Sequence, residues 1–144
     1  ILEKTLTYLK LIFRQKSLVI QKHYAESQLT ALIDASQIQQ VLLNILQNAA
    51  DASPEGGTIS IATSVAQRKE QPGKEFVKIT IRDYGPGLSA DIQQHLFEPF
   101  HTTKTEGTGL GLMLSKYIID RHQGYIEITN AEGGGALVSL YLPQ

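Results

Sequence analysis

The order of apolar and polar positions predicts helices over residues 1–14, 35–52 and 109–122. In each segment apolar side chains recur every three or four residues, which places them on one helical face. Pro54, with the two glycines that follow it, predicts the end of the second helix, and Gly124 predicts the end of the third. One side of the third helix is expected to carry Leu110, Leu114, Tyr117, Ile118 and Arg121.

Short alternating or β-branched segments predict strands over residues 18–25, 30–34, 58–65, 76–83, 125–130 and 136–142. Residues 66–75 are polar and contain Pro72 and Gly73, which favours a hairpin connection, and 133–135 is a second hairpin turn of three glycines. Residues 84–108 form a long connection with a short helix expected near 89–96. This order predicts an α/β two-layer sandwich, with a mixed, mostly antiparallel sheet covered on one face by helices.

The chain has 144 residues, which is the length of one ordinary domain, so residues 1–144 are expected to form a single domain. A hydrophobic fraction of 42% and a net charge of −1 are typical of a folded globular chain, with no basic excess for nucleic acid or a membrane surface. The absence of cysteine excludes disulfides, thiolate metal sites and cysteine nucleophiles. Because the chain begins at Ile1, we expect it to be a segment of a longer protein.

The polar side of helix 35–52 is the first candidate site. Asn44, Asn48 and Asp51 follow one another at i, i+4 and i+7, and Asp51 is the only charged residue of this helix. A solvated face normally carries Lys and Glu, and asparagine is a poor helix former. The amides therefore suit a site in which one amide oxygen, waters and a ligand's phosphates hold Mg²⁺. An ordinary polar face, or buried amides satisfied by loops, explains the same pattern equally well.

Two glycine motifs supply further candidates. Asp83 ends a strand and precedes Gly85 and Gly87, so its carboxylate could accept from an exocyclic amine such as that of adenine; taken alone, this motif favours a plain turn. The segment "EGTGLGL" at 106–112 opens a helix whose uncovered N–H groups could bind phosphate. The connection between them holds Lys104, a surface lysine or a cation for a terminal phosphate, and its length suits a lid.

Taken in order, "NILQNAADAS", "DYGPG", "FEPFHTTK" and "GTGLGL" resemble the N, G1, F and G2 boxes of the histidine kinase catalytic and ATP-binding domain. This Bergerat-fold family also includes gyrase, mismatch-repair and heat-shock chaperone ATPases. The later "GGGA" resembles the weaker G3 turn. The short lid and "FHTTK" are most similar to the nitrogen-regulatory subgroup of sensor kinases.

The resemblance implies roles for individual residues. Asn48 would hold Mg²⁺, Asn44 would support the phosphates, and Lys104 would reach the terminal phosphate, so these three are the catalytic candidates. Asp83 would bind the adenine amino group, and residues 88–108 would form the ATP lid. The full ATP-binding set would be Asn48, Asp51, Asp83, Gly85, Gly87, Leu88, Thr102, Thr103, Lys104, Gly107, Thr108, Gly109, Leu110, Gly111 and Leu112. Asp51 stands where many relatives carry a basic residue.

The resemblance also implies a mechanism and partners. ATPase relatives carry a water-activating glutamate where this chain has Asn44, and an amide cannot act as a general base, so phosphoryl transfer is expected in preference to hydrolysis. None of the four histidines lies in the family's acceptor motif. The dimerisation and phosphoacceptor helices would therefore lie upstream, with residues 1–16 as the helix that follows them, and a response-regulator receiver domain would take the phosphate next.

The expected ligands are thus ATP or ADP with Mg²⁺, in a bacterial-type cytoplasmic setting, without nucleic acid and without membrane contact by this segment, although the parent chain could be anchored. Three alternatives stay open: a Bergerat ATPase, an anti-sigma-type serine kinase, and a regulatory module that binds nucleotide without transfer.

Overall fold

The computed structural model describes residues 1–100 and 109–144. The described helices are α1 (Leu2–Gln15), α2 (Ala35–Ala52), α3 (Ala90–Gln94) and α4 (Gly111–Arg121). The described strands are β1 (Val19–His23), β2 (Thr58–Arg68), β3 (Gln71–Asp83), β4 (Tyr125–Asn130) and β5 (Ala136–Pro143).

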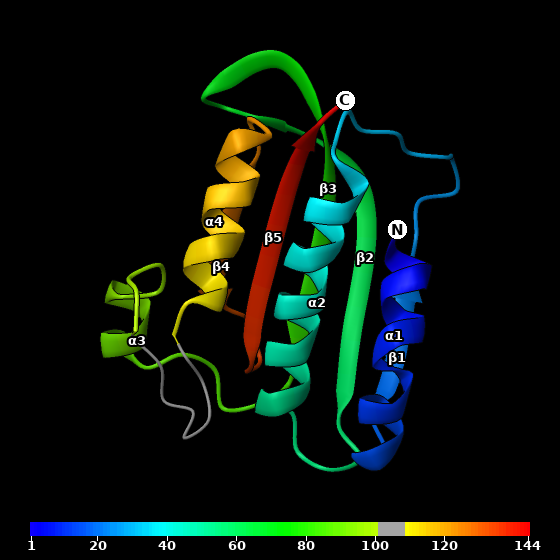
Figure 1. Ribbon diagram of the computed structural model, residues 1–144, viewed down its shortest axis with the longest axis vertical. Coiled ribbons are helices and arrows are strands. Elements are labelled where there is room, and N and C mark those ends of the chain that lie inside the picture. The colour runs from blue at the N-terminus through cyan, green and yellow to red at the C-terminus, as the bar shows by residue number, and fades with distance from the viewer. Residues whose placement is uncertain (101–108) are drawn as a thin grey trace.

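The strands form one sheet in the order β1-β2-β3-β5-β4. β1 is parallel to β2, and the other three pairings are antiparallel. Helices α1, α2 and α4 lie side by side on one face of this sheet, and α3 stands apart beyond the beginning of α4 (Figure 1). The predicted two-layer sandwich with a mixed, mostly antiparallel sheet is therefore confirmed.

The core lies between α2 and the middle of the sheet. Its largest fully buried apolar side chains come from one α2 stripe, the facing strand positions and α4, namely Ile38, Val41, Leu42, Ile45, Leu46, Ile59, Ile61, Ile81, Ile119, Leu140 and Leu142. Each such side chain contributes about 1.5–3 kcal/mol relative to exposure. Since α2 packs between α1 and α4, the core fixes the direction in which its polar side faces.

Both ends of α2 are held by side chains. Asp34 Oδ1 accepts from the backbone N–H groups of Ser36 (2.9 Å) and Gln37 (3.1 Å), and bonds to these residues, the Ser36 hydroxyl first, keep the pKa of Asp34 below its ordinary value. At the other end, Lys16 Nζ donates to the carbonyls of Ala50 and Ser53, each at 2.6 Å. A cation at a helix C-terminus complements the negative end of the helix dipole.

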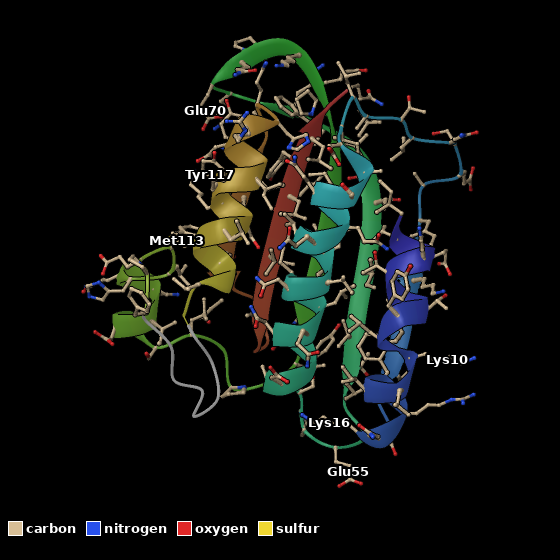
Figure 2. The ribbon with its side chains drawn as sticks, in the orientation of Figure 1. Lys10, Lys16, Glu55, Glu70, Met113 and Tyr117 are labelled. Atoms are coloured by element: carbon tan, nitrogen blue, oxygen red, sulfur yellow. The ribbon has the colours of Figure 1, made fainter. Side chains whose placement is uncertain are left out.

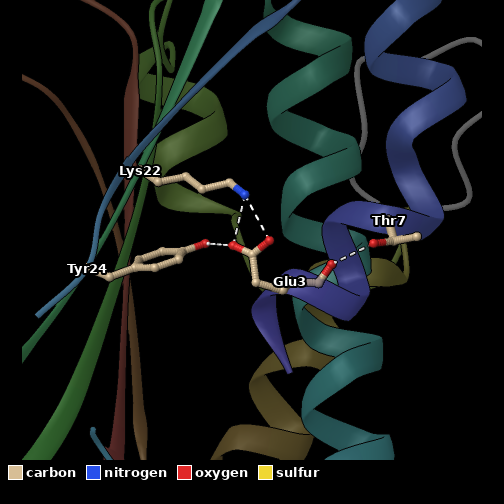
Figure 3. Close-up of polar contacts among 4 residues, drawn as sticks. All are labelled: Glu3, Thr7, Lys22 and Tyr24. Atoms are coloured by element: carbon tan, nitrogen blue, oxygen red, sulfur yellow. Dashed lines mark hydrogen bonds and ion pairs between the residues drawn. The ribbon is translucent and has the colours of Figure 1, made fainter. Parts of the chain in front are cut away.

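The first helix is tied to the edge strand by a polar cluster (Figure 3). The Glu3 carboxylate accepts from Lys22 Nζ at 2.8 Å with both oxygens and from the Tyr24 hydroxyl at 2.8 Å. These bonds, that of Lys22 first, hold the pKa of Glu3 below its ordinary value. Burial, and then the bond to Glu3, raises the pKa of Tyr24.

Two predicted features of the strands were wrong. Residues 30–34 form no strand, because this segment makes one backbone bond to β5, from Leu32 N–H to the Pro143 carbonyl (3.2 Å), and no ladder. The predicted turn at 66–75 is largely strand: β2 continues to Arg68, β3 begins at Gln71, and the register shifts between Gln67 and Arg68. Pro72 and Gly73 therefore lie in an irregular part of β3, where Gly73 supplies a positive φ of 82°.

The predicted face and end of the third helix also need correction. The buried residues of α4 are Ser115, Ile118 and Ile119, whereas Tyr117 is 57% exposed. The apolar residues of α4 thus cover two faces, of which one packs on the core. The helix ends through Gln123, which has the positive φ of 56°, and Gly124 is needed because a Cβ there would overlap the Tyr141 carbonyl oxygen.

Candidate functional site

A cavity of about 510 Å³ opens between the C-terminal half of α2, the start of α4 and the segment that follows β3. Its described polar lining comes mainly from α2 and comprises Asn44, Gln47, Asn48, Asp51 and Asp83. The other lining side chains are apolar and come from the sheet, both helices and the segment after β3. A cavity with an apolar floor and a few polar groups on one side suits a ligand with a flat apolar part and a polar part.

Among the described polar residues that line this cavity, Asp83 is the buried one, with an exposed fraction of 6%. It ends β3, and strand alternation places it on the same face as Ile81, which faces the helices. Its Oδ1 accepts from the N–H groups of Gly85 (3.0 Å) and Ala136 (3.2 Å). No described residue donates to Oδ2, so this oxygen is available to a donor in the cavity.

Three glycines bring the chain close to Asp83. A Cβ on Gly85 would overlap the Ala52 carbonyl oxygen, and one on Gly135 would overlap the main chain of Asp83. Gly87 has a φ of 77°, and a Cβ there would come within 2.7 Å of Asn130 Oδ1. These glycines are therefore required because other parts of the protein lie against them, and the resulting close packing fixes the position of the Asp83 carboxylate.

Asn44 joins α2 to α4 beside the cavity. Its Nδ2 donates to Ser115 Oγ at 3.1 Å. A Cβ on Gly111 would overlap the Asn44 amide, so this glycine permits the close approach of the two helices. Asn44 therefore holds the beginning of α4, the segment expected to bind phosphate, against α2. Its amide thus donates to Ser115 and lies against the main chain at Gly111.

Asn48 and Asp51 lie one and two turns beyond Asn44 on the same side of α2. Gln47 Nε2 donates to Asp51 Oδ1 at 3.0 Å. Among the described residues, no three His, Cys, Asp or Glu side chains gather to hold a metal ion. One amide oxygen still fits Mg²⁺, because this ion usually retains several waters and takes its other ligands from bound phosphates. Asn44, Gln47 and Asn48 are the described lining residues that carry an amide oxygen.

The structure brings most of the predicted residues to one cavity. Those that line it are Asn44, Asn48, Asp51, Asp83, Gly87, Leu88, Gly109, Gly111 and Leu112. Gly85 and Leu110 are not among its lining residues. Thr102, Thr103, Lys104, Gly107 and Thr108 lie outside the described residues, as does part of the predicted lid.

The apolar floor was missed at the sequence level. Its members from the sheet are Ile81, Ile128, Ala136 and Val138, and α2 adds Ile45, Ala49 and Ala52. One signal could have identified Ile81, since it is two residues before Asp83 and strand alternation places both side chains on one face. The β4–β5 hairpin brings its residues beside Asp83 through tertiary contacts, which alternation alone does not predict.

The exposed side of α4 adjoins this cavity. Met113 and Tyr117, labelled in Figure 2, lie on the side of α4 that is remote from α2, and their exposed fractions are 37% and 57%. Leu114, between them, is 40% exposed. Large apolar side chains that gather on one surface are typical of an interaction site. Across the described ranges, no helix combines the length and the apolar character needed to cross a bilayer.

Residues 33–144 match the family of histidine kinase-, DNA gyrase B- and HSP90-like ATPases. The chain is 37% identical over 134 residues to the sensory histidine kinase/phosphatase NtrB of Vibrio alginolyticus, covering 90% of this chain and 38% of that protein. It resembles the solved catalytic domain of the histidine kinase ThkA with a TM-score of 0.83 and 30% identity, over 98% of this chain and 88% of that one. A structure of ThkA with the response regulator TrrA matches with a TM-score of 0.80 and 26% identity, over 99% and 39% of the two chains.

Proposed function

The chain belongs to the histidine kinase-, DNA gyrase B- and HSP90-like ATPase family, and we propose that it binds Mg-ATP and donates the terminal phosphate to a histidine on a separate domain. Within this family it is a catalytic and ATP-binding domain of the histidine kinase type. The chain spans 38% of NtrB, so the activity of the whole protein is part of the proposal.

The observation that carries the proposal is the chemistry of the α2 side of the cavity. Hydrolysis needs a group that takes a proton from water, and an amide cannot do this. Asn44 instead donates to Ser115. The two carboxylates among the described lining residues are Asp83, whose Oδ1 accepts from two backbone N–H groups, and Asp51, which accepts from Gln47. This arrangement favours positioning and transfer over activation of water.

In the proposed complex, Asp83 Oδ2 accepts from the adenine amino group while Ile81, Ile128 and Val138 contact the base. Asn48 contributes an amide oxygen to Mg²⁺, which when bound neutralises part of the phosphate charge. The N–H groups at the beginning of α4 face the phosphates. Lys104, outside the described residues, is the proposed cation for the terminal phosphate.

The acceptor would be a neutral imidazole, which needs no base to attack. Its nitrogen forms a bond to the terminal phosphorus, the bond from that phosphorus to the bridging oxygen breaks, and ADP leaves. The imidazole proton passes to solvent. The exposed surface of Met113, Leu114 and Tyr117 is where we place the acceptor helices, because it lies on the helix that begins at the phosphate end of the cavity. A receiver domain would then accept the phosphate, in the cytoplasm, where ATP is available.

The test mixes this domain with the separately expressed phosphoacceptor domain of the same protein and γ-labelled ATP. We expect acid-labile label on the acceptor, strongly reduced by Asn48→Ala and unchanged by Gln37→Ala, an exposed position on the same helix outside the cavity. Release of labelled phosphate without an acceptor would indicate an ATPase. Acid-stable label would indicate a serine kinase, and ATP binding without either product a regulatory module.

A further inference from the structure

A second concave surface lies between α1 and the edge strand β1, on a side of the molecule that the nucleotide cavity does not reach. It encloses about 510 Å³ and shares no described lining residue with that cavity. We call it the α1–β1 groove and define it by Leu6, Lys10, Phe13, Arg14, Ser17, Leu18, Ile20 and Lys22.

The groove has an apolar floor and a cationic rim. Leu6, Phe13, Leu18 and Ile20 supply its apolar surface, and no described lining residue is a carboxylate, although the whole chain has a net charge of −1. Lys22 is neutralised by Glu3 at 2.8 Å (Figure 3).

Two of the rim cations have no partner among the residues that the structure describes. The side chains of Lys10 and Arg14 make no ion pair or hydrogen bond with any described residue. Figure 2 shows the labelled Lys10 extending away from the molecule. An anionic group can therefore approach both cations without displacing an existing interaction.

The floor of the groove ends at an open strand edge. Among the described strands, β1 pairs with β2 alone. Val19 N–H donates toward β2, to the Gly57 carbonyl at 2.9 Å. Because hydrogen-bonding direction alternates along a strand, the N–H and C=O groups of Ile20 and Lys22 face the open side. Such an edge can pair with an additional extended chain.

We propose that the α1–β1 groove binds an acidic, extended segment of a partner protein as an added strand on β1. Alternate apolar side chains of that segment would lie on the floor formed by Phe13 and Ile20, and its carboxylates would pair with Lys10 and Arg14. Charge complementarity selects the acidic class. The open edge selects an extended peptide over an anionic lipid surface, because headgroups cannot reproduce backbone pairing with Ile20 and Lys22.

The probe is a short fluorescent peptide in which glutamate alternates with valine, titrated by anisotropy. We expect saturable binding that the double variant Lys10→Glu/Arg14→Glu weakens by at least about tenfold, or 1.4 kcal/mol. Lys4→Glu reverses an exposed charge on the same helix outside the groove and should change affinity by less than about twofold. Amide exchange at Ile20 and Lys22 should slow when the peptide binds, and unchanged ATP binding by the double variant shows that it is folded.

Any one of these peptide results would overturn the proposal: no binding of the glutamate peptide, equal binding of a peptide that alternates lysine with valine, equal weakening by Lys4→Glu, or unchanged exchange at Ile20 and Lys22. Binding of phosphatidylglycerol vesicles in place of the peptide would assign the groove to a membrane surface and would also contradict it.

Discussion

Asp83 has a structural role in the fold and, under the proposed function, a role in recognising adenine, and two substitutions separate the two roles. Its Oδ1 accepts from the N–H groups of Gly85 and Ala136, while Oδ2 has no donor among the described residues. Asparagine keeps one oxygen for the two N–H groups and puts an NH₂ donor where Oδ2 was. Alanine removes both oxygens and leaves two N–H groups without an acceptor.

The two variants should differ in stability and agree in losing ATP. A bond to a charged group contributes about 1.5–3 kcal/mol and one between neutral groups about 0.5–1.5 kcal/mol, so Asp83→Asn should lower the free energy of unfolding by about 1–3 kcal/mol. Asp83→Ala leaves two unsatisfied donors at about 1–3 kcal/mol each, or about 2–6 kcal/mol. ATP affinity should fall by at least about 2 kcal/mol, or thirtyfold, in both variants.

The assay is calorimetric titration with ATP and with inosine triphosphate, whose base has a carbonyl oxygen in place of the adenine amino group. The asparagine NH₂ can donate to that oxygen, so Asp83→Asn should shift the preference toward inosine triphosphate, whereas Asp83→Ala should not. Urea unfolding measures the stability of each variant. Wild-type ATP affinity in Asp83→Asn, or an unchanged preference between the two nucleotides, would refute the assigned role.

Three further predictions concern stability. Lys16→Met removes the bonds to the end of α2 and should lower the free energy of unfolding by about 1–3 kcal/mol. The control Lys4→Met should cause no measurable change, and equal urea midpoints for the two variants would contradict the prediction. The lowered pKa of Glu3 stabilises the folded state at pH values above the unfolded glutamate pKa of 4.5, and this contribution is lost as the pH falls through the folded pKa. Wild type should therefore be more stable than Glu3→Gln by about 0.2–1 kcal/mol at neutral pH, and this difference should disappear in acid. An advantage that grows on acidification would show the wrong sign. Gly135 has a φ of 82° and a Cβ there would overlap Asp83, so Gly135→Ala should lower the free energy of unfolding by about 2–5 kcal/mol. Gly134 has a φ of 105° but open space around it, so Gly134→Ala should lower it by about 1–2 kcal/mol. Thermal unfolding that ranks the two variants in reverse would reject the overlap argument.

Local patterns predicted the elements that have strong periodicity. Helix 35–52 has the predicted bounds because apolar spacing and the following Pro54 agree. Residues 30–34 carry a strand-like composition, yet they make a single backbone bond to β5 and no ladder, and Leu32 is 87% exposed. Strand assignment needs a pairing partner, and composition does not supply one.

Candidate site residues were predicted from their chemistry, but their contacts were not. The sequence indicated that Asn44 and Gly111 belong to one site. It did not indicate that Gly111 allows α4 to approach Asn44, because that contact joins residues far apart in the chain. The same limit applies to Lys16, whose bonds to the end of α2 depend on how α1 packs against it.

The central claim is that the cavity between α2 and α4 binds Mg-ATP, and calorimetric titration of the purified domain tests it most directly. We predict saturable binding of ATP that requires Mg²⁺ and that Asn48→Ala weakens by at least about tenfold, while Gln37→Ala binds as wild type. A folded wild-type domain that takes up no ATP, or an affinity that neither Mg²⁺ removal nor Asn48→Ala alters, would contradict the account.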